Sequence, residues 1–259
     1  DVIRRDYDGF VMYEGGFAQL EYNKDKVSAF VSGGLTNTSY WRKDRFYYSG
    51  DKQVSSKKHY LGGNVKAGLN YNLDEYNNVF FNTGFISRAP IFDNTFINSQ
   101  SSHERNPDAK NEKVYSFELG YGYRSHYFTA NVNAYYTMWK DKALYDTGSY
   151  EDANGASQRW TMNMSGAQAN HMGIELDFIA KPFRWMEVNG MFSWGDWRWS
   201  GTAKGFMMNT EGQIMASGRG EIATDMSNVD QYKYTIKMDD VQVGGSAQTT
   251  AALGLTFRP

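Results

Sequence analysis

The chain has 259 residues and a net charge of −2, so it lacks the basic excess expected of a nucleic-acid-binding domain. It has no cysteine, which excludes disulfides and thiolate chemistry, and no run approaches the roughly 18 apolar residues of a membrane helix. Aromatic residues reach 16%, glycine occurs 26 times and proline 4 times, with a mean hydropathy of −0.65, which favours a chain built mostly from strands.

Alternation of apolar and polar residues with a period of two predicts about nine strands. In chain order they cover 16–22, 27–37, 64–73, 78–88, 114–124, 127–139, 172–181, 185–194 and 248–257. In 114–124, for example, Phe117 and Leu119 share one face while Glu118 and Arg124 share the other. Many segments exceed the about five to six residues of an ordinary strand, and no segment of useful length has a convincing helical period.

The predicted connections alternate between two lengths. Short turns fall at 23–26, 74–77, 125–126 and 182–184, and long polar segments at 42–61, 89–112, 141–158 and 200–246. Short turns at one rim and long loops at the other are the layout of an outer-membrane barrel. Alternation alone also fits a soluble sandwich. Strand length, loop sorting and the many Tyr and Trp residues near strand ends favour the transmembrane barrel.

An odd number of strands is unexpected for a complete barrel of this kind. Bacterial single-chain barrels normally have even strand numbers, and an open sheet would leave unpaired edges in lipid. We therefore expect residues 1–259 to be one segment of a larger barrel, with further strands beside it.

Three motifs between Asn78 and Lys142 resemble those of TonB-dependent receptors. The strand end Gly84-Phe-Ile-Ser-Arg-Ala-Pro90 is similar to the family's G-F-R-A-P, and Asn106-Pro-Asp-Ala-Lys-Asn-Glu112 to its N-P-D-L-K-P-E, with Asn111 in place of the second Pro. Glu118-Leu-Gly120 then looks like the family's E-L-G, in the same order and at similar spacing. Trp139-Lys-Asp141 and Gly173-Ile-Glu-Leu176 also look like family strand starts.

The resemblance implies an all-β fold, namely an antiparallel up-and-down transmembrane barrel of about 22 strands in the bacterial outer membrane, closed by a plug. Residues 1–259 would supply about nine strands from the C-terminal part, with the plug domain and the last strand not present. The implied function is energised uptake of a scarce nutrient such as an iron chelate, cobalamin, haem or an oligosaccharide. The implied partners are the TonB complex through the plug, the N-terminal remainder of the receptor, outer-membrane lipid, and a small-molecule or glycan substrate.

Other classes of function predict different features. A passive outer-membrane porin, the main alternative, needs neither plug nor TonB and leaves the three motifs unexplained. An outer-membrane enzyme needs a catalytic constellation, and the sequence offers no nucleophile elbow, phosphate loop or dyad. The four histidines lack ligand spacing, so we expect no metal and no cofactor. A soluble β-rich binding module would be released from membranes by salt, without detergent.

The polar faces of the predicted strands supply candidate contacts to the barrel lumen or the plug. These residues are Lys66, Glu118, Arg124, Asn131, Asn133, Glu175 and Asp177. A plug contact is favoured for Glu118, because a buried carboxylate needs a partner. The alternative is that all seven are solvated lumen residues whose ion pairs contribute little.

Three residues are candidates for ligand binding on the extracellular side: Trp197, Trp199 and Arg88. The two tryptophans share the polar phase and could stack on a sugar ring or a planar chelate, whereas Trp194 shares the apolar phase and fits the aromatic girdle. Arg88 belongs here if its strand keeps phase through Ser87. The longest segment, 200–246, fits an extracellular lid or a mobile polar loop that could hide a short hairpin near 232–243; its acids do not fit an EF-hand.

Overall fold

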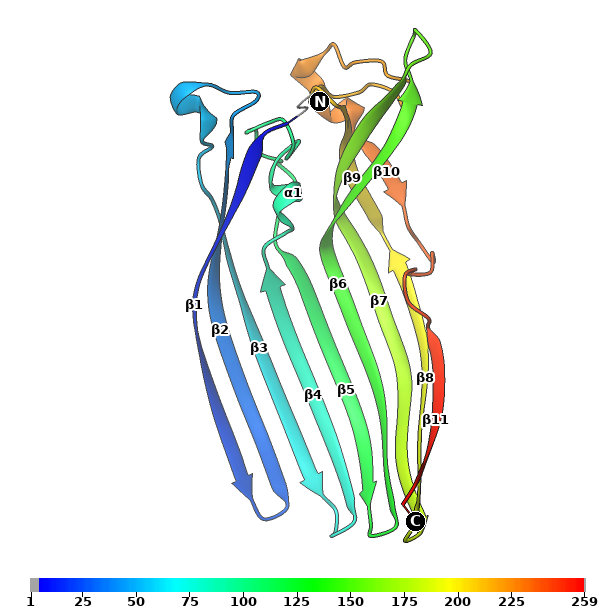
Figure 1. The fold of residues 1–259 in the computed structure, drawn as a ribbon. Coiled ribbons are helices and arrows are strands. Elements are labelled where there is room, and N and C mark those ends of the chain that lie inside the picture. Colours follow the sequence, from blue (N-terminus) through cyan, green and yellow to red (C-terminus); the bar gives the residue numbers. More distant parts are fainter. Residues whose placement is uncertain (1–4, 259) are drawn as a thin grey trace.

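A computed structural model describes residues 5–258. All strands of these residues belong to one antiparallel sheet (Figure 1). Nine long strands pair in sequence order: β1 (Tyr7–Lys24), β2 (Val27–Asp44), β3 (Lys58–Asn72), β4 (Asn77–Arg88), β5 (Glu112–Arg124), β6 (Phe128–Glu151), β7 (Ser157–Phe183), β8 (Met186–Ser200) and β11 (Thr249–Phe257). We call these nine strands the wall. Each matches one predicted segment, so the strand prediction is confirmed. The sheet is open in the described residues, with β1 and β11 as its edges, as expected for part of a barrel.

Five smaller elements complete the described chain. They are the 3₁₀ helix η1 (Gly50–Gln53), α1 (Phe92–Thr95), β9 (Thr202–Asn209), the 3₁₀ helix η2 (Met226–Tyr232) and β10 (Tyr234–Lys237). None of the helices formed by residues 5–258 is long and apolar enough to cross a membrane.

Short turns join the strands at one end of the wall and long connections join them at the other (Figure 1). All four predicted turns are confirmed; in one of them the Asp74 carboxylate accepts hydrogen bonds from the backbone N–H groups of Tyr76 and Asn77. In an outer-membrane barrel the short turns face the periplasm. We therefore call the turn end the inner end and the loop end the outer end. The described chain starts at the outer end and finishes at the inner end.

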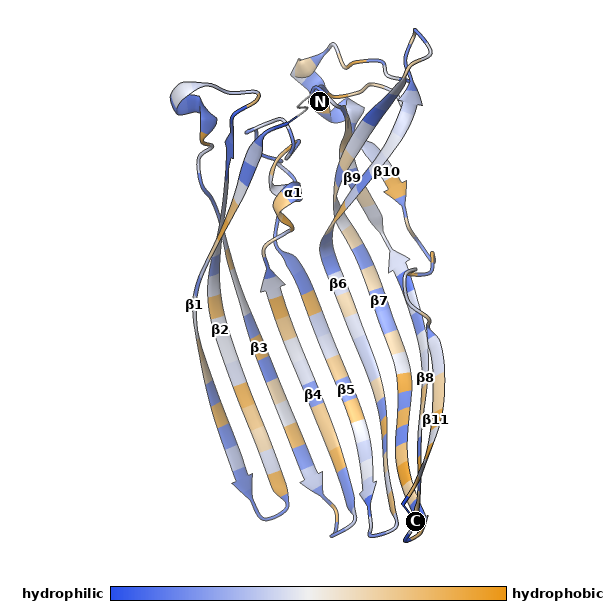
Figure 2. Ribbon diagram, in the orientation of Figure 1, coloured by the Kyte–Doolittle hydropathy of each residue, from blue (hydrophilic) through white to orange (hydrophobic). Residues whose placement is uncertain are grey.

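Cross-strand pairing gives the wall one apolar and one polar face, because directly opposite residues point the same way. One row on the apolar face runs Tyr22, Ala29, Leu69, Phe81, Leu119, Ala134, Ile174 and Trp194. The alternation along each strand is visible in Figure 2. The apolar side chains are exposed: Leu35 is 67% and Leu119 61% accessible. A soluble protein would cover so large an apolar surface, so this face is built for lipid.

Two of the predicted loops are wrong, because regular structure continues beyond the apolar belt. Strands β6 and β7 form a long hairpin through most of 141–158 and leave only 152–156 as a connection. Outside the belt the two faces of a strand no longer meet lipid and lumen. Polar residues such as Asp146 and Thr147 therefore occupy both faces, and the period-two signal is lost.

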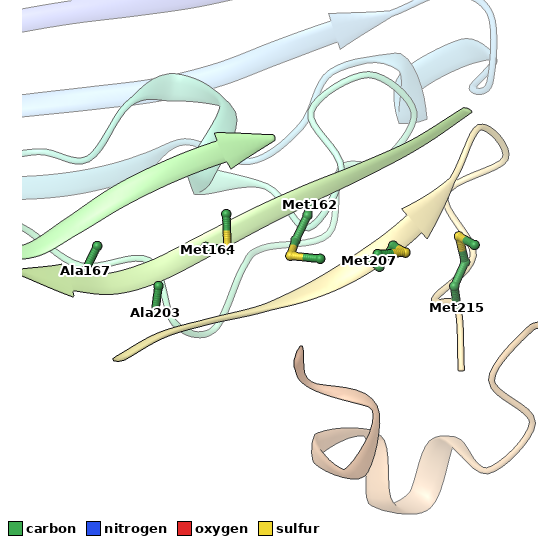
Figure 3. Close-up of a cluster of buried hydrophobic side chains, with 6 residues drawn as sticks. All are labelled: Met162, Met164, Ala167, Ala203, Met207 and Met215. Atoms are coloured by element: carbon green, nitrogen blue, oxygen red, sulfur yellow. The ribbon is translucent and has the colours of Figure 1, made fainter. Parts of the chain in front are cut away.

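The segment 200–246 folds into a packed lobe instead of a mobile loop. Strand β9 pairs with β7 over Trp160–Ser165, where β8 no longer reaches, and β10 pairs with β9. Gly166, with φ of +89°, lies where β7 changes partners. We call the segment 200–246 together with the outer part of β7 the rim lobe. Buried hydrophobic side chains hold it together (Figure 3): Met162, Met164, Ala167, Ala203, Met207 and Met215. The predicted hairpin near 232–243 is half right, since β10 lies there but pairs with β9.

Candidate functional site

The connection between β4 and β5, which we call the inward loop (residues 89–111), folds over the polar face at the outer end of the wall. On one side the Tyr40 hydroxyl of β2 donates to the Pro90 carbonyl at 2.9 Å. On the other side the Asn163 amide of β7 lies 2.9 and 3.0 Å from the carbonyl oxygens of Asp93 and Phe96. The loop therefore ties β2 to β7 across the strands between them.

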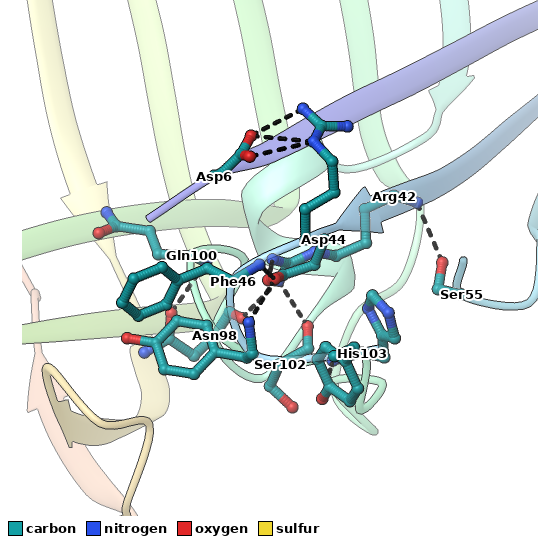
Figure 4. Close-up of polar contacts among 12 residues, drawn as sticks. Asp6, Arg42, Asp44, Phe46, Ser55, Asn98, Gln100, Ser102 and His103 are labelled. Carbon is teal, nitrogen blue, oxygen red and sulfur yellow. Dashed lines mark hydrogen bonds and ion pairs between the residues drawn. The ribbon is translucent and has the colours of Figure 1, made fainter. Parts of the chain in front are cut away.

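A buried ion pair anchors the inward loop (Figure 4). Arg42 and Asp44 of β2 are 0% and 1% exposed and pair with each other. The Arg42 guanidinium also donates to the Ser102 carbonyl at 2.8 Å and lies over the Phe96 ring at 5.8 Å. Asp44 accepts from the backbone N–H groups that follow it, at 2.8 Å each. These contacts replace most of the hydrogen bonds that burial removes, although Arg42 Nε is left without a partner among the described residues, and the buried pair thereby positions the loop.

His103 connects the inward loop to the β2–β3 connection. Its ring stacks on Tyr48 with 3.9 Å between centroids, and its Nε2 lies 3.1 and 3.0 Å from the carbonyl oxygens of Lys52 and Gln53. Because carbonyls only accept, Nε2 carries the proton in this arrangement. Burial, aided by the positive charge of Arg42, lowers the pKa of His103 below its usual value of 6.5.

Acidification should therefore loosen this contact. The pKa of His103 in the folded state lies below its unfolded value of 6.5, so the unfolded segment binds more protons on acidification. The stabilisation that His103 contributes is therefore complete above about pH 6.5 and falls as the pH drops toward the folded pKa. We expect protease cleavage within 89–111 of the purified receptor to rise between about pH 7 and 5. His103→Gln, which keeps a donor but cannot charge, should flatten this dependence. An unchanged pH profile in that variant would contradict the assignment.

Further toward the inner end, the same face holds a recess of about 440 Å³, which we call the aromatic pocket. Four neighbouring strands line it with Glu118, Asn133, Tyr135, Thr137, Trp139, His171, Glu175 and Trp197. Cross-strand pairing explains the convergence, because Thr137, His171 and Trp197 stand directly opposite one another on β6, β7 and β8. The short inner turns fix this register.

Two rings of the aromatic pocket, those of Tyr135 and Trp197, lie over glycine positions of the wall. The Trp197 indole N–H donates to the Tyr135 hydroxyl at 2.9 Å, and the His171 ring lies 5.6 Å from Trp197. Glycines make the room: a Cβ on Gly173 would lie 2.6 Å from the Tyr135 hydroxyl oxygen, and one on Gly195 2.6 Å from the Trp197 nitrogen. The two rings are thereby held as a platform before any ligand arrives.

The carboxylates of the aromatic pocket are bound to amides. Glu118 accepts from Asn82 at 3.1 Å and from Asn133 at 3.0 Å, and Asn133 also lies 3.3 Å from Glu175. Within residues 5–258, neither glutamate has a Lys or Arg nitrogen within 4.0 Å. Among the residues that the structure describes, both carboxylates therefore lack an ion-pair partner, while Lys142 and Arg88 lie over the neighbouring Trp139 ring at 4.3 and 5.1 Å.

The other predicted polar-face residues lie apart from the aromatic pocket. Lys66, Asn131 and Asp177 fall on the polar face by strand pairing, and Asn131 donates to Asp177 at 2.9 Å. Arg124 and Asn131 line a separate polar recess of about 390 Å³ at the inner end. Of the seven residues, Glu118, Asn133 and Glu175 meet at one place.

The three predicted ligand contacts have different surroundings. Trp197 lines the aromatic pocket, whereas Trp199 packs against the methionines of the rim lobe. Arg88 pairs with the buried Glu112 at 2.7 Å and lies over the Trp139 ring at 5.1 Å, so it borders the pocket through Trp139. Their roles in binding stay predictions. The sequence reading missed Tyr135, Trp139 and His171, although aromatic side chains in a polar phase were the available signal.

An amphipathic antiparallel wall with an exposed apolar belt, short turns at one end and folded loops at the other defines the class of the protein, a segment of an outer-membrane β-barrel. The family model "TonB dependent receptor-like, beta-barrel" matches residues 2–259. The chain therefore belongs to the TonB-dependent receptor β-barrel family, and the expected family is confirmed. Members of this family are receptors in the bacterial outer membrane.

Two solved structures align with the chain. The copper transporter OprC aligns with a TM-score of 0.55 and 14% identity over 96% of this chain and 40% of its own. The siderophore receptor PirA from Pseudomonas aeruginosa gives 0.38 and 11%, over 79% of this chain and 52% of its own. No curated protein matches the sequence. The chain thus spans less than half the length of OprC.

Proposed function

We propose that this chain forms part of the wall of a TonB-dependent receptor that takes up a scarce nutrient by energised transport. The family match over residues 2–259 is the observation that carries the proposal. The polar face supports it, because the inward loop and the aromatic pocket give that face a shaped surface suited to binding. The proposed partners are the TonB complex acting through a plug, the N-terminal remainder of the receptor, and an iron chelate, cobalamin, haem or oligosaccharide as cargo.

The proposed division of the molecule follows the wall. Residues 1–259 act as one transmembrane barrel segment, and the plug comes from outside them. Trp197 contacts the cargo directly, and Arg88 and Trp199 contact it at the extracellular side. Glu118 meets the plug, while Lys66, Arg124, Asn131 and Asp177 form the lumen surface around it.

A copper cargo does not follow from the likeness to OprC, which concerns fold alone. Thioether sulfur suits Cu(I), and the rim lobe holds Met162, Met164, Met207 and Met215. However, these side chains are 0–8% exposed and pack with Ala167 and other apolar groups, as methionine does in an irregular core. They stabilise the rim lobe.

Energy dependence separates the proposed function from a passive porin. Cells that produce the full-length receptor are offered chelated iron, cobalamin and oligosaccharides, and receptor-dependent uptake is measured with and without a protonophore. If import is energised, collapse of the proton-motive force should reduce uptake at least about tenfold. Diffusion through a porin needs no energy input and should continue. Uptake that continues unchanged with the protonophore would overturn energised import.

A further inference from the structure

We propose that the aromatic pocket binds an organic cation, a guanidinium or ammonium group seated between the Trp197–Tyr135 platform and the carboxylates of Glu118 and Glu175. The proposal deepens the proposed function by naming the chemistry of the bound group. It rests on that function only in requiring that ligands reach the polar face of the wall.

The charges of the aromatic pocket are the first argument. Two carboxylates share one amide, since Asn133 donates to Glu118 at 3.0 Å and lies 3.3 Å from Glu175. An ionised carboxylate has about four acceptor positions, so most of them stay open. No basic side chain of residues 5–258 lies within 4.0 Å of either group. Two negative charges that converge on one recess favour a positively charged occupant.

The aromatic rings are the second argument. A cation is attracted to the face of an aromatic ring, most strongly to that of Trp. The Tyr135 hydroxyl lies over Gly173 and the Trp197 indole nitrogen over Gly195, so no side chain beneath them displaces the two rings from the recess. The hydrogen bond of 2.9 Å between them fixes both orientations. Rings and carboxylates together form the pairing that recognises a guanidinium or an ammonium group.

Other ligand classes fit the aromatic pocket less well. An anionic ligand would be repelled by Glu118 and Glu175. A neutral sugar could stack on Trp197, but it would leave both charges uncompensated. The cation itself has two possible sources, a positively charged part of the cargo or a basic side chain of the plug.

Agmatine, which carries one guanidinium and one ammonium group, is a suitable probe. The full-length receptor in detergent is titrated with agmatine and, in parallel, with neutral maltotriose, and isothermal titration calorimetry measures binding in every variant. We expect saturable binding of agmatine only. The double variant Glu118→Gln/Glu175→Gln should weaken binding at least about tenfold. Trp197→Leu, which keeps both carboxylates, should weaken binding about fivefold and covers the case in which the double variant does not fold.

Asp177→Asn is the matched control, because Asp177 accepts a similar amide hydrogen bond from Asn131 but lies outside the aromatic pocket. It should bind agmatine as the unmodified receptor does. If agmatine does not bind, but the double variant lowers the thermal unfolding midpoint of the full-length receptor and Asp177→Asn does not, the plug supplies the cation. Three results would overturn the proposal: maltotriose binding in preference to agmatine, equal agmatine affinity in the double variant, or neither binding nor selective destabilisation. Binding at equilibrium needs no energy source, so such a failure leaves the uptake proposal to its own test.

Discussion

Replacing Arg42 by methionine should detach the inward loop and destabilise the outer end of the wall by about 3–5 kcal/mol. The variant leaves the Asp44 carboxylate, 1% exposed, without its positive partner. It also removes the donor to the Ser102 carbonyl. Urea unfolding of the purified receptor would give the free energy, and protease cleavage within residues 89–111 would report detachment of the loop.

Arg45→Met is the matched control for Arg42→Met. Arg45 lies three residues further along and pairs with Asp6 at 2.7 Å and Asp8 at 2.8 Å, yet its side chain is 35% exposed. Water already screens such pairs, so their removal should change stability far less. Equal losses in the two variants would mean that burial of the Arg42–Asp44 pair does not anchor the loop.

The strands of the wall could be predicted because their environment imposes a periodic pattern on the sequence. Between lipid and lumen every second side chain must be apolar, so 114–124 and 172–181 carry the full period. At the outer end this constraint stops. The outer halves of β6 and β7 and all of β9 are held by backbone pairing and by buried methionines such as Met207, which leave no periodic signal.

The site divides in the same way. Alternation predicted that Glu118, Glu175 and Trp197 lie on the polar faces of their strands. Strand register then brings them together, and register depends on the turns between strands, so the pattern within one strand does not predict it. The inward loop could not be predicted from its partners. Tyr40 and Asn163 hold it through backbone carbonyls, which every residue possesses.

A lysine at Leu119 tests the orientation of the whole wall. Leu119 is 61% exposed and stands between Phe117 and Tyr121 on the apolar face of β5, near the middle of the belt. If this face meets hydrocarbon, Leu119→Lys should destabilise the barrel by about 2–4 kcal/mol, the cost of a cation near the bilayer midplane. In water the same change would cost little, because Leu119 already makes few contacts that lysine would lose.

The control for Leu119→Lys is a lysine on the opposite face. Asn131→Lys on β6 would stand opposite Asp177, which could pair with the new ammonium group, so stability should hardly change. Folding of the full-length receptor into vesicles, followed by the heat-dependent shift of electrophoretic mobility, gives the folded fraction of each variant. A loss at both positions would mean that the barrel tolerates lysine on neither face. A loss at Asn131 alone would reverse the wall, placing the carboxylate-lined face against lipid and the exposed aliphatic face in water.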